Sequence, residues 1–224
     1  EAALSCIGIT DYSSVTFDSL KLKALPGNRI WLSVPRNPPA LARLREFDRR
    51  ARFEFGGSDS KTRHIVWRPA NGGQPFRVYS PLWKYLQEQR PERATSWERP
   101  FGEILARDFT VLARFRSERD ALNNMGEPFY HYFMAGIRGL GTWGIGWYID
   151  RCPHQLAQLA DAAGDGDVQA LLQVTYEDYR IVEVIDVSGR DAAYFERELD
   201  DAWIRAMVEG LQARRGPDMM PALR

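Results

Sequence analysis

The sequence has few of the residues that would assign it to a specialised class of protein. Only two of its 224 residues are cysteine, which excludes a scaffold held together by several disulfides. Lysine is almost absent, with four residues against 26 arginines, and no run of about 18 apolar residues could form a transmembrane helix. Two thiols without a disulfide framework and the lack of a membrane span predict a cytoplasmic protein that does not bind a membrane.

Net charge is also missing, because 30 Lys and Arg residues balance 30 Asp and Glu residues. Residues 1–119 hold 21 basic and 13 acidic residues, a balance of +8, whereas residues 120–224 hold 9 and 17, a balance of −8. No compact basic run accompanies the positive half, so we do not expect the chain to bind nucleic acid. Opposite charges on the two halves are the reason to consider a protein partner, and a homo-oligomer is open as well.

The apolar fraction is ordinary, at 44%, and is enough for a sizeable core. Segments typical of strands alternate with segments typical of helices. This alternation predicts a layered α/β domain over residues 1–215, with a mostly parallel, Rossmann-like sheet, an added antiparallel hairpin and a long C-terminal helix. Gly216-Pro217 stops that helix, and residues 216–224 are expected to form a flexible tail.

Two strand–loop–helix units are expected in the first half of the chain. Residues 29–34 predict a strand, and Asn37 is a plausible N-cap with Pro38 at the first position of a helix that ends near Ala51. Short strands are expected over residues 64–67 and 76–79. Ser80 followed by Pro81 then gives a second capping signal, before a helix that includes residues 82–86.

The second half predicts a central pair of strands, two helices and a hairpin. The strands cover residues 109–115 and 131–137, the helices residues 142–151 and 155–163, and the hairpin residues 171–176 and 180–187. A long amphipathic helix follows, because apolar residues recur at helical spacing at Phe195, Leu199, Trp203, Met207 and Leu211.

One segment carries a chemical signature, namely residues 136–144, GIRGLGTWG. An apolar strand is predicted to run into this glycine-rich turn and then into a helix. Glycine allows close approach of a ligand to the backbone, and the N–H groups at a helix start bind phosphate readily. Arg138 adds positive charge, and Thr142 can cap the helix or donate its hydroxyl. The candidate ligand-binding residues of the turn are Gly136, Arg138, Gly139, Gly141, Thr142 and Gly144.

Two familiar nucleotide motifs fit this turn only in part. Residues 139–144 match G-x-G-x-x-G, but the acidic residue expected after the next strand is not clearly present, which disfavours a nicotinamide dehydrogenase. Residues 136–142 spell G-x-x-x-x-G-T without the lysine of a Walker A loop, which disfavours classical ATP or GTP hydrolysis. A purely structural interpretation is equally open, in which the glycines let a helix pack tightly on the sheet.

Residues elsewhere in the chain could complete the site. Ligands of open α/β sheets bind beyond the carboxyl ends of the strands, so parallel strands would add Asn37, Ser80 and Arg116 to the site. Converging arginines there would favour an anionic small molecule. Asp108 and Glu103 are conceivable acid/base carboxylates, although no catalytic residue is assigned. Cys152 and His154 lack a second pair of ligands, so no metal site is expected.

The segment of residues 132–147 resembles the glycine-rich turn of Rossmann-like nucleotide-sensing domains, those of the SLOG type in particular. The resemblance implies that a nucleotide, or a signal derived from one, contacts Gly139, Gly141 and Thr142. Three functions stay open. They are binding or sensing of a phosphorylated small molecule, nucleotide processing by a hydrolase or glycosyl-transfer enzyme, and protein interaction by an immunity-type module without a ligand pocket.

Overall fold

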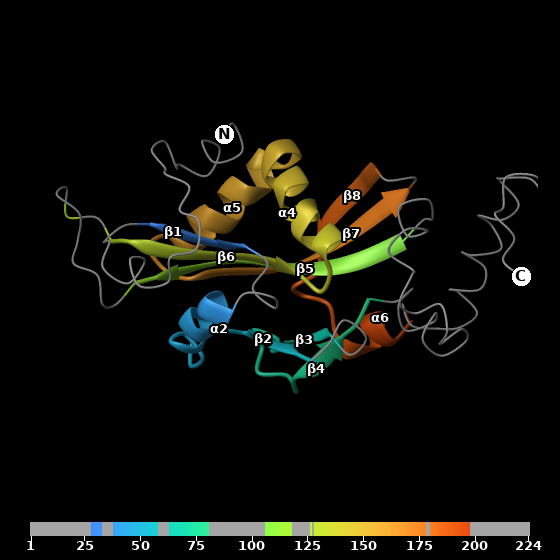
Figure 1. Ribbon diagram of the computed structural model, residues 1–224, viewed down its shortest axis with the longest axis horizontal. Helices are drawn as coiled ribbons and strands as arrows, with labels where there is room; N and C mark the ends of the chain where they lie inside the picture. The colour runs from blue at the N-terminus through green and yellow to red at the C-terminus, as the bar shows by residue number, and fades with distance from the viewer. Residues whose placement is uncertain are drawn as a thin grey trace, which may run out of the picture.

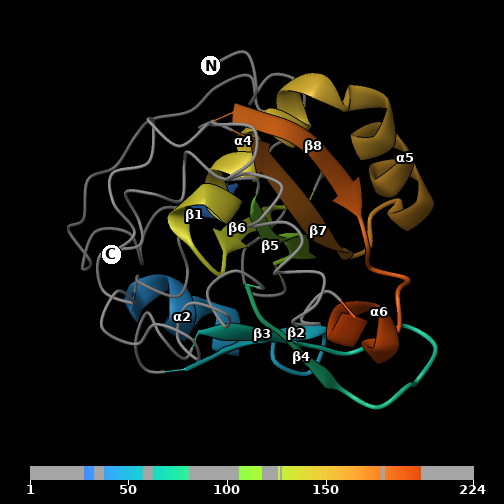
Figure 2. The same cartoon turned by 90° about the vertical axis from the view of Figure 1, so that its right-hand side faces the viewer.

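A five-stranded sheet forms the middle of three layers in the computed structural model, which describes residues 28–32, 38–57, 63–80, 106–117, 126, 128–177 and 180–197. Its strands are β1 (Arg29–Leu32), β5 (Ala106–Arg116), β6 (Tyr130–Gly136), β7 (Val168–Glu177) and β8 (Arg180–Asp186). Helices α4 (Gly139–Arg151) and α5 (Pro153–Ala163) cover one face (Figure 1). Against the other face lie α2 (Pro38–Arg45), α6 (Ala192–Arg197) and a second sheet of β2 (Phe53–Gly56), β3 (His64–Trp67) and β4 (Phe76–Val78) (Figures 1 and 2).

The strands of the central sheet lie in the order β1-β6-β5-β7-β8, and β1–β6 is its one parallel pair among the described residues. The pairs β6–β5, β5–β7 and β7–β8 are all antiparallel. The prediction of a mostly parallel, Rossmann-like sheet is therefore wrong. The second sheet, β2-β3-β4, is antiparallel throughout its described pairs.

The error has a definite physical cause at β5. Strands β6 and β7 run in the same direction, because each is antiparallel to β5, and α4 and α5 connect them across one face. The strand–helix–strand order expected from the sequence is therefore present, as β6, the helices α4 and α5, and β7. In the sheet, however, β6 and β7 are not neighbours, because β5 lies between them. Local periodicity specifies the elements and not their neighbours, so it cannot distinguish this split arrangement from a parallel sheet.

Alternation along β5 separates two hydrophobic cores. Val111, Ala113 and Phe115 are buried against the layer that contains α2 and β2–β4. Leu112 points to the opposite face, where it belongs to the core under α4 and α5. Both faces of β5 are buried, which explains why its sequence is apolar over most of its length.

Several predicted elements are confirmed. The strands at residues 29–32, 64–67 and 76–78 are present, and β7 and β8 form the expected antiparallel hairpin, with a β-bulge near Tyr176. Helix α5 is present as well, and it begins at Pro153, two residues before the predicted start. Strand β2 was not predicted. Its four residues directly follow the predicted helix end near Ala51 and run into the turn-forming pair Gly56-Gly57, where Gly57 has a φ of 86°.

Two helices differ from the predictions. Helix α2 ends at Arg45 instead of near Ala51, and residues 46–50 form turns. The described residues contain no long C-terminal helix, since α6 covers only Ala192–Arg197. The rest of that predicted helix, the predicted tail, Asn37 and the helix expected after Ser80 lie outside the described residues.

The two oppositely charged halves of the sequence do not form two separate bodies. Strand β5 belongs to the positive half, yet it lies between β6 and β7, which both belong to the negative half. Strand β1 likewise pairs with β6. The change of charge along the chain therefore marks no boundary in the described fold.

Candidate functional site

The glycine-rich turn connects β6 to α4 at one end of the central sheet (Figure 1). Gly136 ends β6, and Arg138 is the N-cap residue of α4, with extended backbone angles and no capping hydrogen bond from its side chain. The N–H of Gly136 donates to Oγ1 of Thr142 at 2.9 Å, and the N–H of Thr142 donates to the carbonyl of Arg138 at 3.2 Å. The Thr142 hydroxyl thus accepts a hydrogen bond that closes the turn.

Close packing accounts for three of the glycines. A Cβ atom at Gly136 would lie 2.5 Å from the backbone nitrogen of Thr142, and one at Gly144 would lie 2.4 Å from a methyl carbon of Val174. A Cβ atom at Gly141 would lie 2.7 Å from Oδ2 of Asp108. The start of α4 therefore rests on β5, β6 and β7 at a distance that a larger residue would not allow.

The carboxylate of Asp108, at the start of β5, holds the turn in place. Its Oδ2 accepts the N–H of Arg138 at 3.2 Å and that of Gly141 at 3.0 Å, and its Oδ1 accepts the N–H of Phe109 at 2.9 Å. Its side chain is 0% exposed. The sequence predicts that amide N–H groups at the start of α4 bind a ligand's phosphate. Two of these groups, those of Arg138 and Gly141, instead donate to the carboxylate of Asp108.

Burial shapes the electrostatics of this pair of charges. Desolvation raises the pKa of the Asp108 carboxyl to about 6, against the opposing effects of the Arg138 charge and the three amide donors. Arg138 is itself only 5% exposed. The charge of Arg138 therefore offsets part of the cost of burying the Asp108 carboxylate, but not all of it.

The solvent-facing side of the same turn is open. Gly139, the first residue of α4, is exposed, and a Cβ atom there would meet nothing within 4 Å. Trp143 lies four residues further along the helix and is 56% exposed. Residues four apart in a helix share one face, so an uncovered stretch of backbone and an exposed indole lie side by side.

Of the predicted site residues outside the turn, Ser80 and Arg116 are described, and they lie at opposite ends of β5. Strand β5 is antiparallel to β6, and its register pairs Arg116 with Tyr130 and Thr110 with Gly136. Six strand residues separate Arg116 from the turn, which corresponds to about 20 Å. Ser80 is buried near the turn's end of the sheet, where its Oγ donates to the carbonyl of Arg107 at 3.5 Å.

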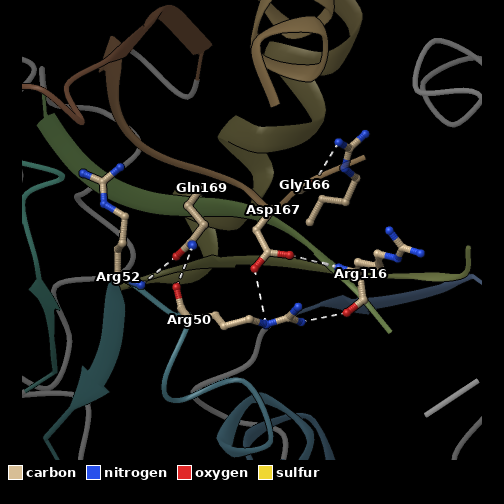
Figure 3. A network of polar contacts seen from close by, with 7 residues as sticks. Arg50, Arg52, Arg116, Gly166, Asp167 and Gln169 are labelled. Carbon is tan, nitrogen blue, oxygen red and sulfur yellow. Dashed lines mark hydrogen bonds and ion pairs between the residues drawn. The ribbon is translucent and has the colours of Figure 1, made fainter. Parts of the chain in front are cut away.

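Arg116 instead contributes its backbone to a structural network at the far end of β5 (Figure 3). Arg50 donates from Nη2 to the Arg116 carbonyl at 2.7 Å, and the N–H of Arg116 donates to Asp167 at 3.1 Å. Gln169 accepts the N–H of Arg52 and donates to the carbonyl of Arg50. This network fastens residues 50–52 to β5 and β7.

Asp108 is the residue of the turn whose role could not be seen in the sequence. It stands directly before the apolar run of residues 109–113, where it suggests only a cap or an acid/base group. Its contacts to residues 30 and 33 positions away depend on the pairing of β5 with β6. One signal in the sequence could have indicated this role. Asp108 is an acidic residue near the start of a strand that is predicted to be buried.

Comparison with family models, with curated proteins and with solved structures gave no match to this chain. Within the described residues, none of the helices combines the length and the apolar character needed to cross a membrane. The same part of the chain contains no group of three or more His, Cys, Asp or Glu side chains arranged to hold a metal ion.

Proposed function

We propose that the chain binds a phosphorylated small molecule, of the nucleotide type, on the solvent-facing side of the α4 N-terminus. The observation that carries this proposal is the pair of an exposed glycine, Gly139, and an exposed tryptophan, Trp143, on one face of the first helical turns. An indole ring offers a stacking surface for a base, and the uncovered backbone offers amide donors to a phosphate.

The internal contacts of the turn limit where the phosphate would bind. Asp108 already accepts the N–H groups of Arg138 and Gly141, so these are not the ligand's donors. The first residues of a helix have no intrahelical acceptor for their N–H groups, which leaves the amides of Gly139 and Leu140 as the proposed donors. The buried charge of Arg138 offsets that of Asp108 and reduces its repulsion of a bound anion.

An enzyme at the same turn finds less support. A raised pKa is typical of a general base, but the Asp108 carboxylate is fully buried and already accepts three backbone hydrogen bonds. A group in this position holds the backbone in place and does not reach a substrate.

Protein interaction is the second candidate function, and the exposure of Trp143 favours it independently. Tryptophan is enriched among the residues that contribute most to protein interfaces. A partner protein would need the indole but would not need the bare backbone at Gly139. The two candidates can therefore be separated at these two positions.

The deciding experiment measures binding of ATP, adenosine and inorganic pyrophosphate by calorimetry and by thermal stabilisation. We expect ATP to bind most tightly, and Trp143→Ala to weaken ATP by about tenfold or more without changing pyrophosphate binding. Gly139→Asp should abolish binding of both phosphorylated probes, because its charge repels them while it suits the helix start.

Gly139→Asn provides the neutral control of similar size, and it should retain more ATP binding than Gly139→Asp. If ATP neither binds nor stabilises the wild-type protein, or if Gly139→Asp binds ATP as well as wild type does, the nucleotide proposal is wrong.

A further inference from the structure

The carboxylate of Asp108 holds the two backbone amides that flank the proposed phosphate donors. It accepts the N–H groups of Arg138 and Gly141, and the proposed donors, Gly139 and Leu140, are the two residues between them. Successive Cα atoms of a chain are about 3.8 Å apart, so a phosphate on these donors would lie within about 10 Å of the carboxylate. Two negative charges would therefore meet at the start of α4.

The surroundings of Asp108 reduce this repulsion only in part. Its side chain is 0% exposed, and salt and water screen a buried charge much less than a surface charge. The positive charge of Arg138 lowers the pKa of the carboxyl, but desolvation outweighs this effect and raises the pKa to about 6. Asp108 is therefore mostly ionised at neutral pH, and it is close to the range in which it gains a proton.

Two titratable groups from other elements interact with Asp108 among the described residues. Arg138, in the turn before α4, keeps its positive charge throughout the range in which Asp108 titrates. Tyr176, on β7, is 1% exposed, and burial together with the charge of Asp108 raises the pKa of its phenol. Helix α4 has no acidic side chain in its first turn. Asp108 is thus the member of this cluster that changes its charge near neutral pH.

We propose that binding of a phosphorylated ligand at the start of α4 is coupled to the uptake of one proton by Asp108. This inference rests on the function proposed above. A bound phosphate disfavours the nearby carboxylate and favours the neutral acid, so the complex holds a proton that the free protein has largely lost. The proton goes to Oδ1, which accepts one amide, so that Oδ2 keeps its hydrogen bonds from Arg138 and Gly141.

Proton uptake makes the affinity for the ligand depend on pH in a defined direction. Below the pKa of the free protein, Asp108 is already neutral, and the ligand binds with its full affinity. As the pH rises through about 6, the free protein loses this proton and the repulsion grows. The affinity therefore falls, and it levels off once Asp108 is ionised in the complex as well. The turn thus binds its ligand more tightly in a mildly acidic environment.

The first test titrates the Asp108 carboxyl of the full chain by carbon-13 NMR, with and without saturating ATP, and Asp108→Asn assigns its signal. We expect ATP to raise the pKa of Asp108 by about 1 or more, because ligand and carboxylate repel each other. A pKa that does not change when ATP binds overturns the coupling and leaves the proposed function intact. Absence of ATP binding at every pH overturns both.

The second test measures the affinity for ATP by calorimetry between about pH 5 and pH 8. The dissociation constant of wild type, divided by that of Asp108→Asn, should rise about tenfold across this range, since asparagine cannot ionise and the titration of ATP itself is common to both proteins. Asp150→Asn removes a carboxylate from the exposed last turn of α4 and should follow wild type. A ratio that stays constant with pH overturns the proposal.

Arg138→Gln tests the same coupling without altering Asp108, and it decides the question if Asp108→Asn does not fold. Loss of the positive charge should raise the pKa of the carboxyl, so the fall in ATP affinity should move to higher pH. This variant keeps the backbone N–H that donates to Asp108. Thermal unfolding at each pH shows whether a variant is folded where its affinity is measured. An unshifted pH profile in Arg138→Gln would contradict the proposal.

Discussion

The face of the central sheet that meets β2–β4 is filled by stacked aromatic rings, whereas the face under α4 and α5 is lined mainly by aliphatic side chains. On the first face Phe115 packs between Phe47, Phe53 and Phe133, with the Phe47 ring centre 4.9 Å away. On the second face α5 has no fully buried residue, and a cavity remains beneath it. The buried charges Asp108 and Arg138 also belong to the turn that begins this second layer.

The two faces of the central sheet differ in how tightly they are packed. Aromatic packing joins the small second sheet to the large one. The helical layer combines close glycine contacts at one end with loose packing at the other. The proposed nucleotide site lies in this helical layer, at the exposed start of α4.

The largest expected effect tests the difference in packing directly. Phe115→Ala should lower the free energy of unfolding by about 3–5 kcal/mol, because it leaves a void among several rings. Leu156→Ala should cost about 1 kcal/mol, since this side chain is only partly buried. Chemical denaturation of the two variants measures both values. Similar losses for both variants would contradict the described difference between the two faces.

A smaller effect concerns the buried carboxylate of Asp108. Its pKa rises from an ordinary 3.8 to about 6 in the folded protein, so the folded state binds this proton more tightly than the unfolded state. The contribution of Asp108 to stability should therefore fall by about 3 kcal/mol as the pH rises through this interval, and level off above it.

Denaturation of wild type and of Asp108→Asn at several pH values isolates this contribution, because the other carboxyl groups are common to both proteins. We expect the stability difference between the two proteins to shift in favour of Asp108→Asn between about pH 4 and pH 6. A difference that does not vary with pH would mean that Asp108 has an ordinary pKa.

The smallest effect compares two glycines of α4. Gly144→Ala should destabilise the protein by about 1–3 kcal/mol, because the added methyl group meets Val174. Gly146→Ala adds the same group where nothing lies within 4 Å, and it should stabilise the helix by up to about 1 kcal/mol. Thermal unfolding of both variants provides the measurement. Stabilisation by both substitutions would show that α4 lies further from β7 than described.

Much of the local structure could be predicted because it depends on short-range patterns. The apolar run of β6, the glycine-rich segment before α4 and the alternating strands β7 and β8 are all visible within a few residues. The interpretation of the glycines as packing residues was also available, and the contacts of Gly136, Gly141 and Gly144 support it. The open side of the turn, at Gly139, carries the nucleotide proposal instead.

The rest of the site required knowledge of which strands are neighbours. The expected convergence of Ser80, Arg116 and the turn assumed parallel strands, and the antiparallel pairing of β5 moves Arg116 to the opposite end of the sheet. The same pairing brings Asp108 to the turn. No pattern within either segment records this contact, because it joins residues that are far apart in the sequence.

Local sequence patterns are enough to locate most of the described strands and helices, and to show that β6 runs through a glycine-rich turn into a helix. Hydrophobic periodicity and turn chemistry act over a few residues, so they are readable along the chain. The order and direction of the strands, and the contact of Asp108 with the start of α4, depend on long-range pairing that no local pattern records. A carboxylate from β5 bonds the amides of Arg138 and Gly141, because the antiparallel sheet places that carboxylate beneath them.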